Sequence, residues 1–189
     1  KFPYLEEVEA VRMGGKWHER AKERADILLD ENMAFQGSAW FTTKTHLESI
    51  NGFGYDETGD EFVLESEELS NKTWLSGGTC MVNKKTWYAH LHKGNEYGRG
   101  YRLASRPMKR QRIFHADYWM HNRWPKQTRM FDWLIDHFWP VPTWPEDWRD
   151  PKYEAAYLER IDKEPGWKSK QFFSVSASRT PQGTLSPSL

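Results

Sequence analysis

Residues 34–43 read AFQGSAWFTT, a run of small, aromatic and threonine residues without a charged side chain. Aromatic and β-branched side chains fit an extended backbone, so this run predicts a buried strand. A similar run over residues 79–89 predicts a second strand, with a bend where Asn83, Lys84 and Lys85 interrupt it. Both strands belong to the predicted sheet.

The segments around these two strands show the apolar spacing of amphipathic helices. Helices are predicted over residues 17–28, 44–50, 65–74, 116–123, 129–138 and 152–163. In the segment 129–138, four side chains fall on one helical face, those of Met130, Trp133, Leu134 and His137. The order helix, strand, helix, strand and then helices indicates an α/β fold and is typical of the second half of a sheet.

The composition excludes several classes of protein. In 189 residues, 27 Lys and Arg balance 27 Asp and Glu, so the whole chain is not a general binder of polyanions. The single cysteine, Cys80, excludes a disulfide scaffold and an all-cysteine zinc site. No apolar run reaches the roughly 20 residues of a membrane span. The 11 Trp residues are expected mainly in the core.

An acidic cluster, residues 65–68, begins the helix predicted over 65–74. The simplest interpretation is a solvated helix N-terminus, because the helix dipole favours carboxylates there. The functional alternative is a carboxylate at a cleft that accepts a proton from a hydroxyl. Glu65 and Glu68 are one turn apart and can share a face, whereas Glu67 points elsewhere.

Two further patterns follow the second strand. His90 and His92 alternate in the segment HLH, which suits either a metal site or a structural or solvent-exposed role. Residues 93–112 then hold seven Lys and Arg against one acid, Glu96, together with three glycines. This basic loop is interpreted as a solvated surface, a clamp for a diphosphate, or a contact with nucleic acid.

Five short segments of the chain occur in an order familiar from one enzyme family. They are GSAWF at 37–41, NGFGYDE at 51–57, ESEEL at 65–69, KTWLSGG at 72–78 and WYAH at 87–90. In this order they resemble the C-terminal half of family 2 glycosyltransferases of the GT-A fold, with its mixed sheet. The similarity is greatest to the polypeptide N-acetylgalactosaminyltransferase branch and its bacterial and phage relatives. It covers residues 34–93 and continues more weakly to about residue 139.

The resemblance implies transfer of a sugar from a nucleotide-sugar donor to a hydroxyl of a glycan, a protein or modified DNA. Gly37 and Ser38 match the segment that forms the floor of the donor-sugar pocket. Glu65, and as second choice Glu68, matches the acid that deprotonates the acceptor in inverting members and holds the substrates in retaining members. Which of the two outcomes applies stays open, as does the oligomeric state.

The resemblance also implies a divalent metal, Mn²⁺ or Mg²⁺, with His90 matching its ligand. The basic loop matches the segment that closes over the donor, with Arg99 and Arg102 in position to contact the diphosphate. A metal and guanidinium groups stabilise the negative charge that develops on such a leaving group. Trp74 and Trp87 match positions that pack in the core of the family.

The chain departs from the family in three ways. Val63 and Leu64 stand where the N-acetylgalactosaminyltransferase branch has Gly-Gly, and Ser66 stands where many bacterial members have Asp. The family's N-terminal half, which binds the nucleotide and carries an Asp-x-Asp or Asp-x-His motif, has no counterpart here. The chain is therefore expected to be a fragment of a longer enzyme.

These inferences predict three regions. Residues 1–139 are the C-terminal part of the catalytic domain, residues 140–172 a Pro/Trp-rich connection and a helix, and residues 173–189 a disordered tail. The resemblance implies a cytoplasmic protein encoded by a bacterium or a phage. Two alternatives stay open: a non-catalytic module that binds glycan or nucleic acid, and a phage-type DNA glycosyltransferase.

Overall fold

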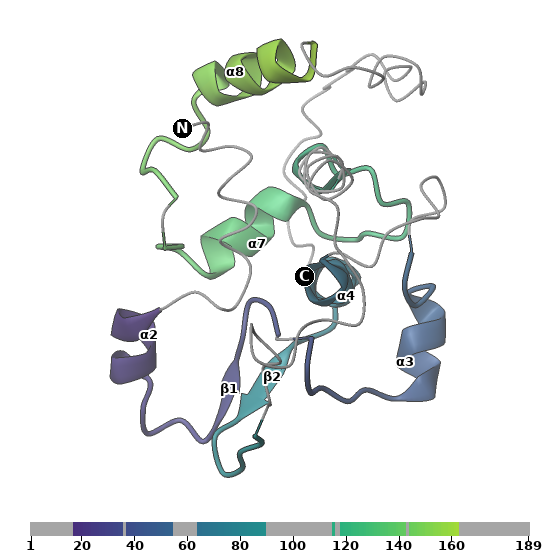
Figure 1. The fold of residues 1–189 in the computed structure, drawn as a ribbon, viewed down its shortest axis with the longest axis vertical. Coiled ribbons are helices and arrows are strands. Elements are labelled where there is room, and N and C mark those ends of the chain that lie inside the picture. Colours follow the sequence, from purple (N-terminus) through teal and green to yellow (C-terminus); the bar gives the residue numbers. More distant parts are fainter. Residues whose placement is uncertain are drawn as a thin grey trace, which may run out of the picture.

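The computed structural model describes residues 17–35, 37–54, 64–89, 115, 118–142 and 144–162. Its helices and strands, in chain order, are α2 (His18–Glu23), β1 (Leu29–Glu31), α3 (Lys44–Ser49), α4 (Glu65–Leu75), β2 (Met81–Asn83), α7 (Phe131–His137) and α8 (Pro151–Asp162). Figure 1 shows α4 almost end-on near the centre of the view, with α7 next to it and the two strands below. The described part of the chain thus combines helices with a small sheet.

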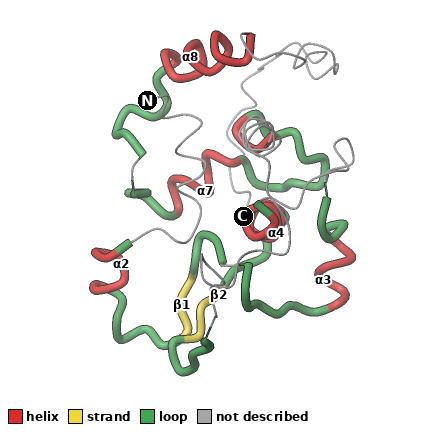
Figure 2. The backbone as a smooth tube through the Cα atoms, viewed as in Figure 1, coloured by secondary structure: helices red, strands yellow, loops and turns green. Residues whose placement is uncertain are grey.

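The sheet consists of β1 and β2, which pair antiparallel with Asp30 opposite Val82. Backbone hydrogen bonds extend the pairing at both ends, from Asn32 N to Cys80 O at 2.9 Å and from Lys84 N to Leu28 O at 2.8 Å. The strand predicted over residues 79–89 is therefore confirmed in part, and the chain turns after β2 (Figure 2).

The strand predicted over residues 34–43 is wrong, since the described residues of this segment form bends and turns. Its buried end does not pair with another strand: the Phe35 N–H is donated to Ser70 Oγ at 3.2 Å. Beyond it, Gly37 and Ser38 lie in an exposed turn, and Phe41 is also exposed. Small polar residues favour a turn, and this local preference outweighs the strand propensity of the aromatic side chains around them.

The ends of the helices follow from their capping residues. Thr43 Oγ1 accepts the His46 N–H at 3.1 Å where α3 begins, and Asp150 Oδ1 accepts the Lys152 N–H at 2.9 Å where α8 begins. After α4, Gly77 has a φ of 96°, a left-handed conformation that favours glycine. The predicted helices at 44–50, 65–74, 129–138 and 152–163 are confirmed, whereas the first helix is shorter than predicted.

Tryptophan side chains dominate the core, as the composition predicts. Within the part of the chain that the structure describes, five of them are buried, and these are Trp74, Trp119, Trp124, Trp144 and Trp148. Trp74 connects α4 to the ends of β1 and α7. Its indole N–H is donated to Asn32 O, just after β1, at 3.1 Å, and its ring packs edge-on against Phe138, just after α7. Trp87, by contrast, is 84% exposed, so its predicted place in the core is wrong.

The predicted face of α7 is wrong in part. Leu134 is buried, but Met130 is exposed, and the buried side chains of the helix are Phe131, Leu134 and Ile135. Met130 precedes the first helical residue and has an extended backbone, with φ −78° and ψ 155°. The helical spacing therefore does not apply to it.

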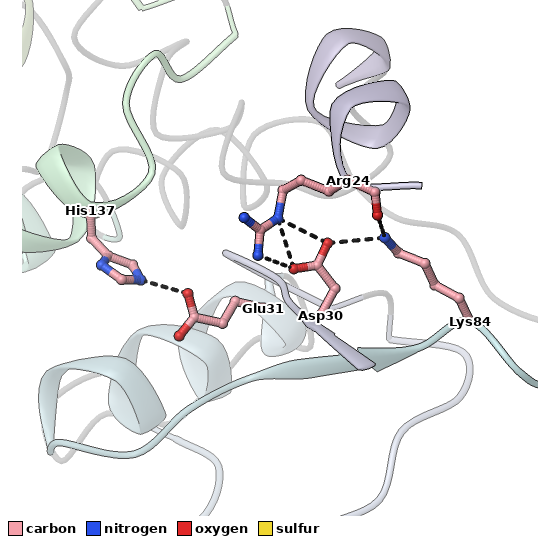
Figure 3. Close-up of polar contacts among 5 residues, drawn as sticks. All are labelled: Arg24, Asp30, Glu31, Lys84 and His137. Carbon is pink, nitrogen blue, oxygen red and sulfur yellow. Dashed lines mark hydrogen bonds and ion pairs between the residues drawn. The ribbon is translucent and has the colours of Figure 1, made fainter. Parts of the chain in front are cut away.

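A cluster of charged side chains connects the sheet to two helices (Figure 3). The buried Asp30 carboxylate accepts hydrogen bonds from Arg24, just after α2, at 2.5 to 3.1 Å and from Lys84 Nζ at 3.0 Å. These contacts hold the pKa of Asp30 well below its ordinary value, with the Arg24 hydrogen bond as the largest cause. On the next residue of β1, Glu31 lies 2.9 Å from His137 Nε2 at the end of α7.

Two of the predicted regions lie outside the described residues: the basic loop at 93–112 and the tail at 173–189. Among the helices that the structure does describe, none has both the length and the apolar character needed to cross a bilayer.

Gly78→Ala is expected to lower the free energy of unfolding by about 1–3 kcal/mol. A Cβ at this position would lie 3.0 Å from the Thr73 carbonyl oxygen and 3.0 Å from Thr73 Cγ2, so the turn after α4 would have to shift. Urea unfolding measures the change. The exposed neighbour offers a control, Thr79→Ala, which should alter stability little. Equal effects of the two substitutions would contradict this packing.

Asp30→Asn is expected to cost about 1.5–3 kcal/mol at pH 7, because Arg24 and Lys84 lose their charged acceptor. Since folding lowers the pKa of Asp30, its stabilisation is fully present above the unfolded pKa of about 3.9. It is lost as the pH falls further. The difference between wild type and variant in urea unfolding should therefore shrink below about pH 4. Asp26→Asn, at an exposed position, is the control.

Candidate functional site

The candidate site is built around the first turn of α4, which carries the acidic cluster. The residue before the helix, Leu64, has φ 71° and ψ 25°, and its side chain is buried. A left-handed backbone costs a residue with a Cβ roughly 1–2 kcal/mol. The buried Leu64 side chain contributes packing that offsets this strain. The chain therefore enters α4 through a constrained turn directly ahead of Glu65.

Glu65 and the predicted donor segment lie against each other. A Cβ built on Gly37 would come within 2.8 Å of Glu65 Oε1 and 3.9 Å of Ser66 Cβ. Only a residue without a side chain leaves the Glu65 carboxylate in this position. Among the described residues, no side chain forms a hydrogen bond or ion pair with that carboxylate. The structure thus brings two predicted site residues, Gly37 and Glu65, into contact.

Glu68 has a different environment from Glu65. It is buried, and Lys72 Nζ, which is also buried, lies 2.6 Å from its Oε1 one helical turn later. Lys72 Nζ further donates to the carbonyl oxygens of Gly52 at 3.0 Å and Gly54 at 2.9 Å. Burial raises the pKa of the Glu68 carboxyl above its ordinary value, and the Lys72 ammonium opposes this effect. The interpretation of the acidic cluster as a solvated helix end is therefore wrong for Glu68.

The same turn buries two more polar side chains. Glu67 Oε2 accepts a hydrogen bond from Ser66 Oγ at 2.7 Å, and Glu67 is as buried as Glu68. Asn71 follows one turn later and is fully buried, with no hydrogen-bond partner for either its amide nitrogen or its amide oxygen within the described part of the chain. Burying an amide without a hydrogen-bond partner is costly, so the position of Asn71 lowers the stability of α4 rather than adding to it.

The Ser38 side chain contacts the segment that follows β2. Its Oγ lies 2.6 Å from the hydroxyl of Tyr88, and both side chains are exposed. This contact joins the turn at residues 37–38 to the segment that leads towards His90. Sequence analysis did not identify Tyr88 as part of the site.

Aromatic rings border the same turn. Trp40 packs between Phe35, at a ring distance of 5.4 Å, and Phe53, at 5.8 Å, and both Trp40 and Phe53 remain partly exposed. Phe53 is the residue between the two glycines whose carbonyls bind Lys72. We call Trp40 and Phe53 the aromatic pair.

Three of the predicted site residues, His90, Arg99 and Arg102, lie outside the described residues. Within the described ranges, no group of three or more His, Cys, Asp or Glu side chains is arranged to hold a metal ion. Cys80 is buried, which raises the pKa of its thiol to about 12 and removes it as a nucleophile at neutral pH.

One of the contacts that the sequence analysis did not predict, the Glu68–Lys72 pair, has a recognisable spacing in the sequence. Glu68 and Lys72 have the i, i+4 spacing of a helical ion pair, but nothing in the pattern shows that the pair is buried. The burial of Asn71 and the contact of Ser38 with Tyr88 depend on packing between distant segments and carry no local signal.

In comparisons with known proteins, no protein-family model, no curated protein and no solved structure matches the chain.

Lys72→Met is expected to cost about 3–5 kcal/mol, because it leaves the Glu68 carboxylate buried without its cation. The double variant Glu68→Leu with Lys72→Met should cost less, since neither charge then remains. The single variant should also gain stability as the pH falls from 8 to 5, because protonation removes the unpaired charge from the interior. Urea unfolding across this pH range measures both effects.

An exposed pair provides the matched control for this test. Lys44 Nζ lies 3.6 Å from Glu48 Oε1 with the same i, i+4 spacing on α3. Lys44→Met should cost at most about 0.5 kcal/mol. A cost as small for Lys72→Met would contradict the buried pair.

Proposed function

We propose that the chain is the C-terminal part of a GT-A glycosyltransferase catalytic domain. It transfers a sugar from a nucleotide-sugar donor to an acceptor hydroxyl. We propose this family because the ordered series of segments between residues 37 and 90 resembles it. The observation that carries the proposal is the contact between Gly37 and Glu65, because it joins the proposed donor floor to the proposed acceptor base.

The backbone at Leu64 also supports the proposal. The N-acetylgalactosaminyltransferase branch has glycine at this place, and glycine is the residue that adopts a left-handed backbone without strain. Leu64 adopts that backbone here, with φ 71°. Leu64 therefore has the left-handed backbone that glycine adopts easily, although no glycine stands at this position. Strain held directly beside Glu65 is consistent with a functional site.

The two glutamates have separate roles in this proposal. Glu65 is the general base or the acceptor-holding group, because its carboxylate is partly exposed and lies beside Gly37. Glu68 is a positioning residue, since its carboxylate is held by Lys72 in the interior. Glu68 and Lys72 fix the first turn of α4 against the segment at Gly52 and Gly54 and so set the position of Glu65.

The remaining parts of the proposal follow from the resemblance. His90 is proposed as a ligand of Mn²⁺ or Mg²⁺, and Arg99 and Arg102 as donors to the diphosphate of the nucleotide. Guanidinium groups in those positions would stabilise the charge on the leaving group. We further propose the cytoplasm of a bacterium or a phage host as the location.

A second candidate is a glycan-binding module without catalysis. The exposed aromatic pair favours it, because such rings bind sugars whether or not a reaction follows. The two candidates differ in whether the Glu65 carboxylate is needed for turnover as well as for binding.

Glu65→Gln is expected to lower sugar transfer about 100-fold or more, because the amide cannot accept the acceptor proton. Gly37→Ala should also lower transfer, since its Cβ would displace the flexible Glu65 carboxylate while leaving the fold intact. The measurement is release of nucleotide diphosphate in the presence of acceptor, on the chain together with any sequence that precedes it. Glu48→Gln, on the exposed face of α3, is the control. Full activity of Glu65→Gln would overturn the assignment.

His90→Ala is expected to abolish transfer that depends on added metal. Calorimetric titration with UDP, with and without Mn²⁺, checks the same assignment on the binding side. Metal-dependent binding that the variant loses would support the role of His90. Transfer unchanged by the substitution would remove His90 from the metal site.

A further inference from the structure

One end of the molecule exposes large aromatic side chains on two segments that contact each other. Phe41, in the segment that leads into α3, is 96% exposed, and Trp87, in the segment after β2, is 84% exposed. The two segments meet where Ser38 Oγ lies 2.6 Å from the Tyr88 hydroxyl. Figure 1 shows both segments towards the lower end of the view, where β1 also begins. Both rings are therefore presented to solvent from one end of the molecule.

The start of β1 adds aliphatic side chains to the same end. Residues 27–29 are Ile, Leu and Leu, and all three are exposed, Leu29 to 59%. Their backbone pairs with the end of β2 and the turn after it, since Lys84 N donates to Leu28 O at 2.8 Å and Leu29 lies opposite Asn83. Soluble proteins rarely expose several large apolar side chains at one place, and where they do, the surface commonly binds a protein or a membrane.

Lysine side chains border these apolar residues. Three Lys and no Asp or Glu occur in the stretches that carry them, which are 27–29, 38–44 and 83–88. Lys84 is held by the Asp30 carboxylate, whereas Lys85 is exposed. Lys44 lies 3.6 Å from Glu48 with both side chains largely exposed, and such a pair is weak. The ammonium groups of Lys44 and Lys85 are thus accessible to an anionic surface.

The arrangement of the rings favours a lipid bilayer as the partner. Because Phe41 is 96% exposed, little of the protein holds its ring in an orientation for stacking on a base. The segments of Phe41 and Trp87 meet through two hydroxyl groups, whereas the centre of a protein interface is apolar and closely packed. A bilayer requires neither condition. Its interfacial region accepts separate aromatic and aliphatic side chains, and its anionic headgroups attract nearby lysines.

We propose that this end of the molecule docks on an anionic lipid bilayer. Leu29, Phe41 and Trp87 insert at the level of the headgroups, and Lys44 and Lys85 contact the anionic headgroups around them. The docking is peripheral and reversible, since these side chains bury far less apolar area than a membrane-spanning helix does. This inference goes beyond the proposed function and does not rest on it.

The test is co-sedimentation of the full chain with phosphatidylcholine vesicles, with and without phosphatidylserine, at physiological ionic strength. We expect the chain to bind the vesicles that contain phosphatidylserine. Phe41→Ser and Trp87→Ser should each weaken this binding at least about 5-fold, because the small polar side chain gains little on insertion. Trp87→Phe keeps a ring and should retain most of the affinity. Met130→Ser is the matched control, since Met130 is 58% exposed at a different place, before α7.

The serine substitutions also separate this surface from the basic loop at 93–112. They leave the charge of the chain unchanged, so a loss of binding cannot come from the Lys and Arg residues of that loop. The substituted side chains are largely exposed, so the variants should keep the fold, and urea unfolding checks this.

Charge variants test the lysines separately. Lys85→Glu should weaken binding to the anionic vesicles about 10-fold. Asp26→Asn removes an exposed acid next to the stretch 27–29 and should tighten the same binding about 5-fold. Both effects should vanish on vesicles of phosphatidylcholine alone.

Four results would overturn the inference. They are the absence of binding to the vesicles with phosphatidylserine, binding that Phe41→Ser and Trp87→Ser leave unchanged, an equal loss of binding in Met130→Ser, and equal binding to vesicles with and without phosphatidylserine. Binding of a single-stranded oligonucleotide that the same two serine variants lose, without binding to vesicles, would assign the rings to nucleic acid and reject the bilayer.

Discussion

The Lys72 ammonium lies in the interior with the Glu68 carboxylate 2.6 Å away and two backbone carbonyls within 3.0 Å. Removing two charges from water is costly, and only good geometry with further hydrogen bonds compensates for it. Here the compensation comes from Gly52 and Gly54, in the segment that follows α3. The ion pair therefore does more than join two residues of one helix: it attaches α4 to a distant part of the chain.

The position of the candidate site follows from this attachment. With its first turn held, α4 presents Glu65 to Gly37, and Ser70 on the same helix accepts the Phe35 N–H at the start of that segment. The other side of α4 packs through Trp74 against Phe138, which brings α7 into the core. A second charged cluster, around Asp30, connects the two strands to α2 and α7 without touching the site (Figure 3). The Glu68–Lys72 pair and the cluster around Asp30 are thus two separate groups of polar contacts.

Local sequence signals predicted the helices well, because caps and stops act within a few residues. In the structure, Thr43 and Asp150 cap the starts of α3 and α8, and Gly77 follows the end of α4. The strand predicted over residues 34–43 is wrong because the aromatic side chains that give this segment its strand propensity pack on other rings, as Trp40 does on Phe53. The prediction that Trp87 lies in the core is wrong for a related reason. Whether a tryptophan is buried depends on which residues cover it, and residue type alone does not show this.

The sequence by itself determined which residues could carry chemistry and which helix carries Glu65 and Glu68, since both follow from residue type and spacing. Only the tertiary structure decided that the two carboxylates differ. Glu68 is buried against Lys72, whereas Glu65 is partly exposed and lies at Gly37. Burial and the approach of distant segments are properties of packing between elements. A helical pattern shows which side chains share a face, but the desolvation of each carboxylate depends on the residues that cover it.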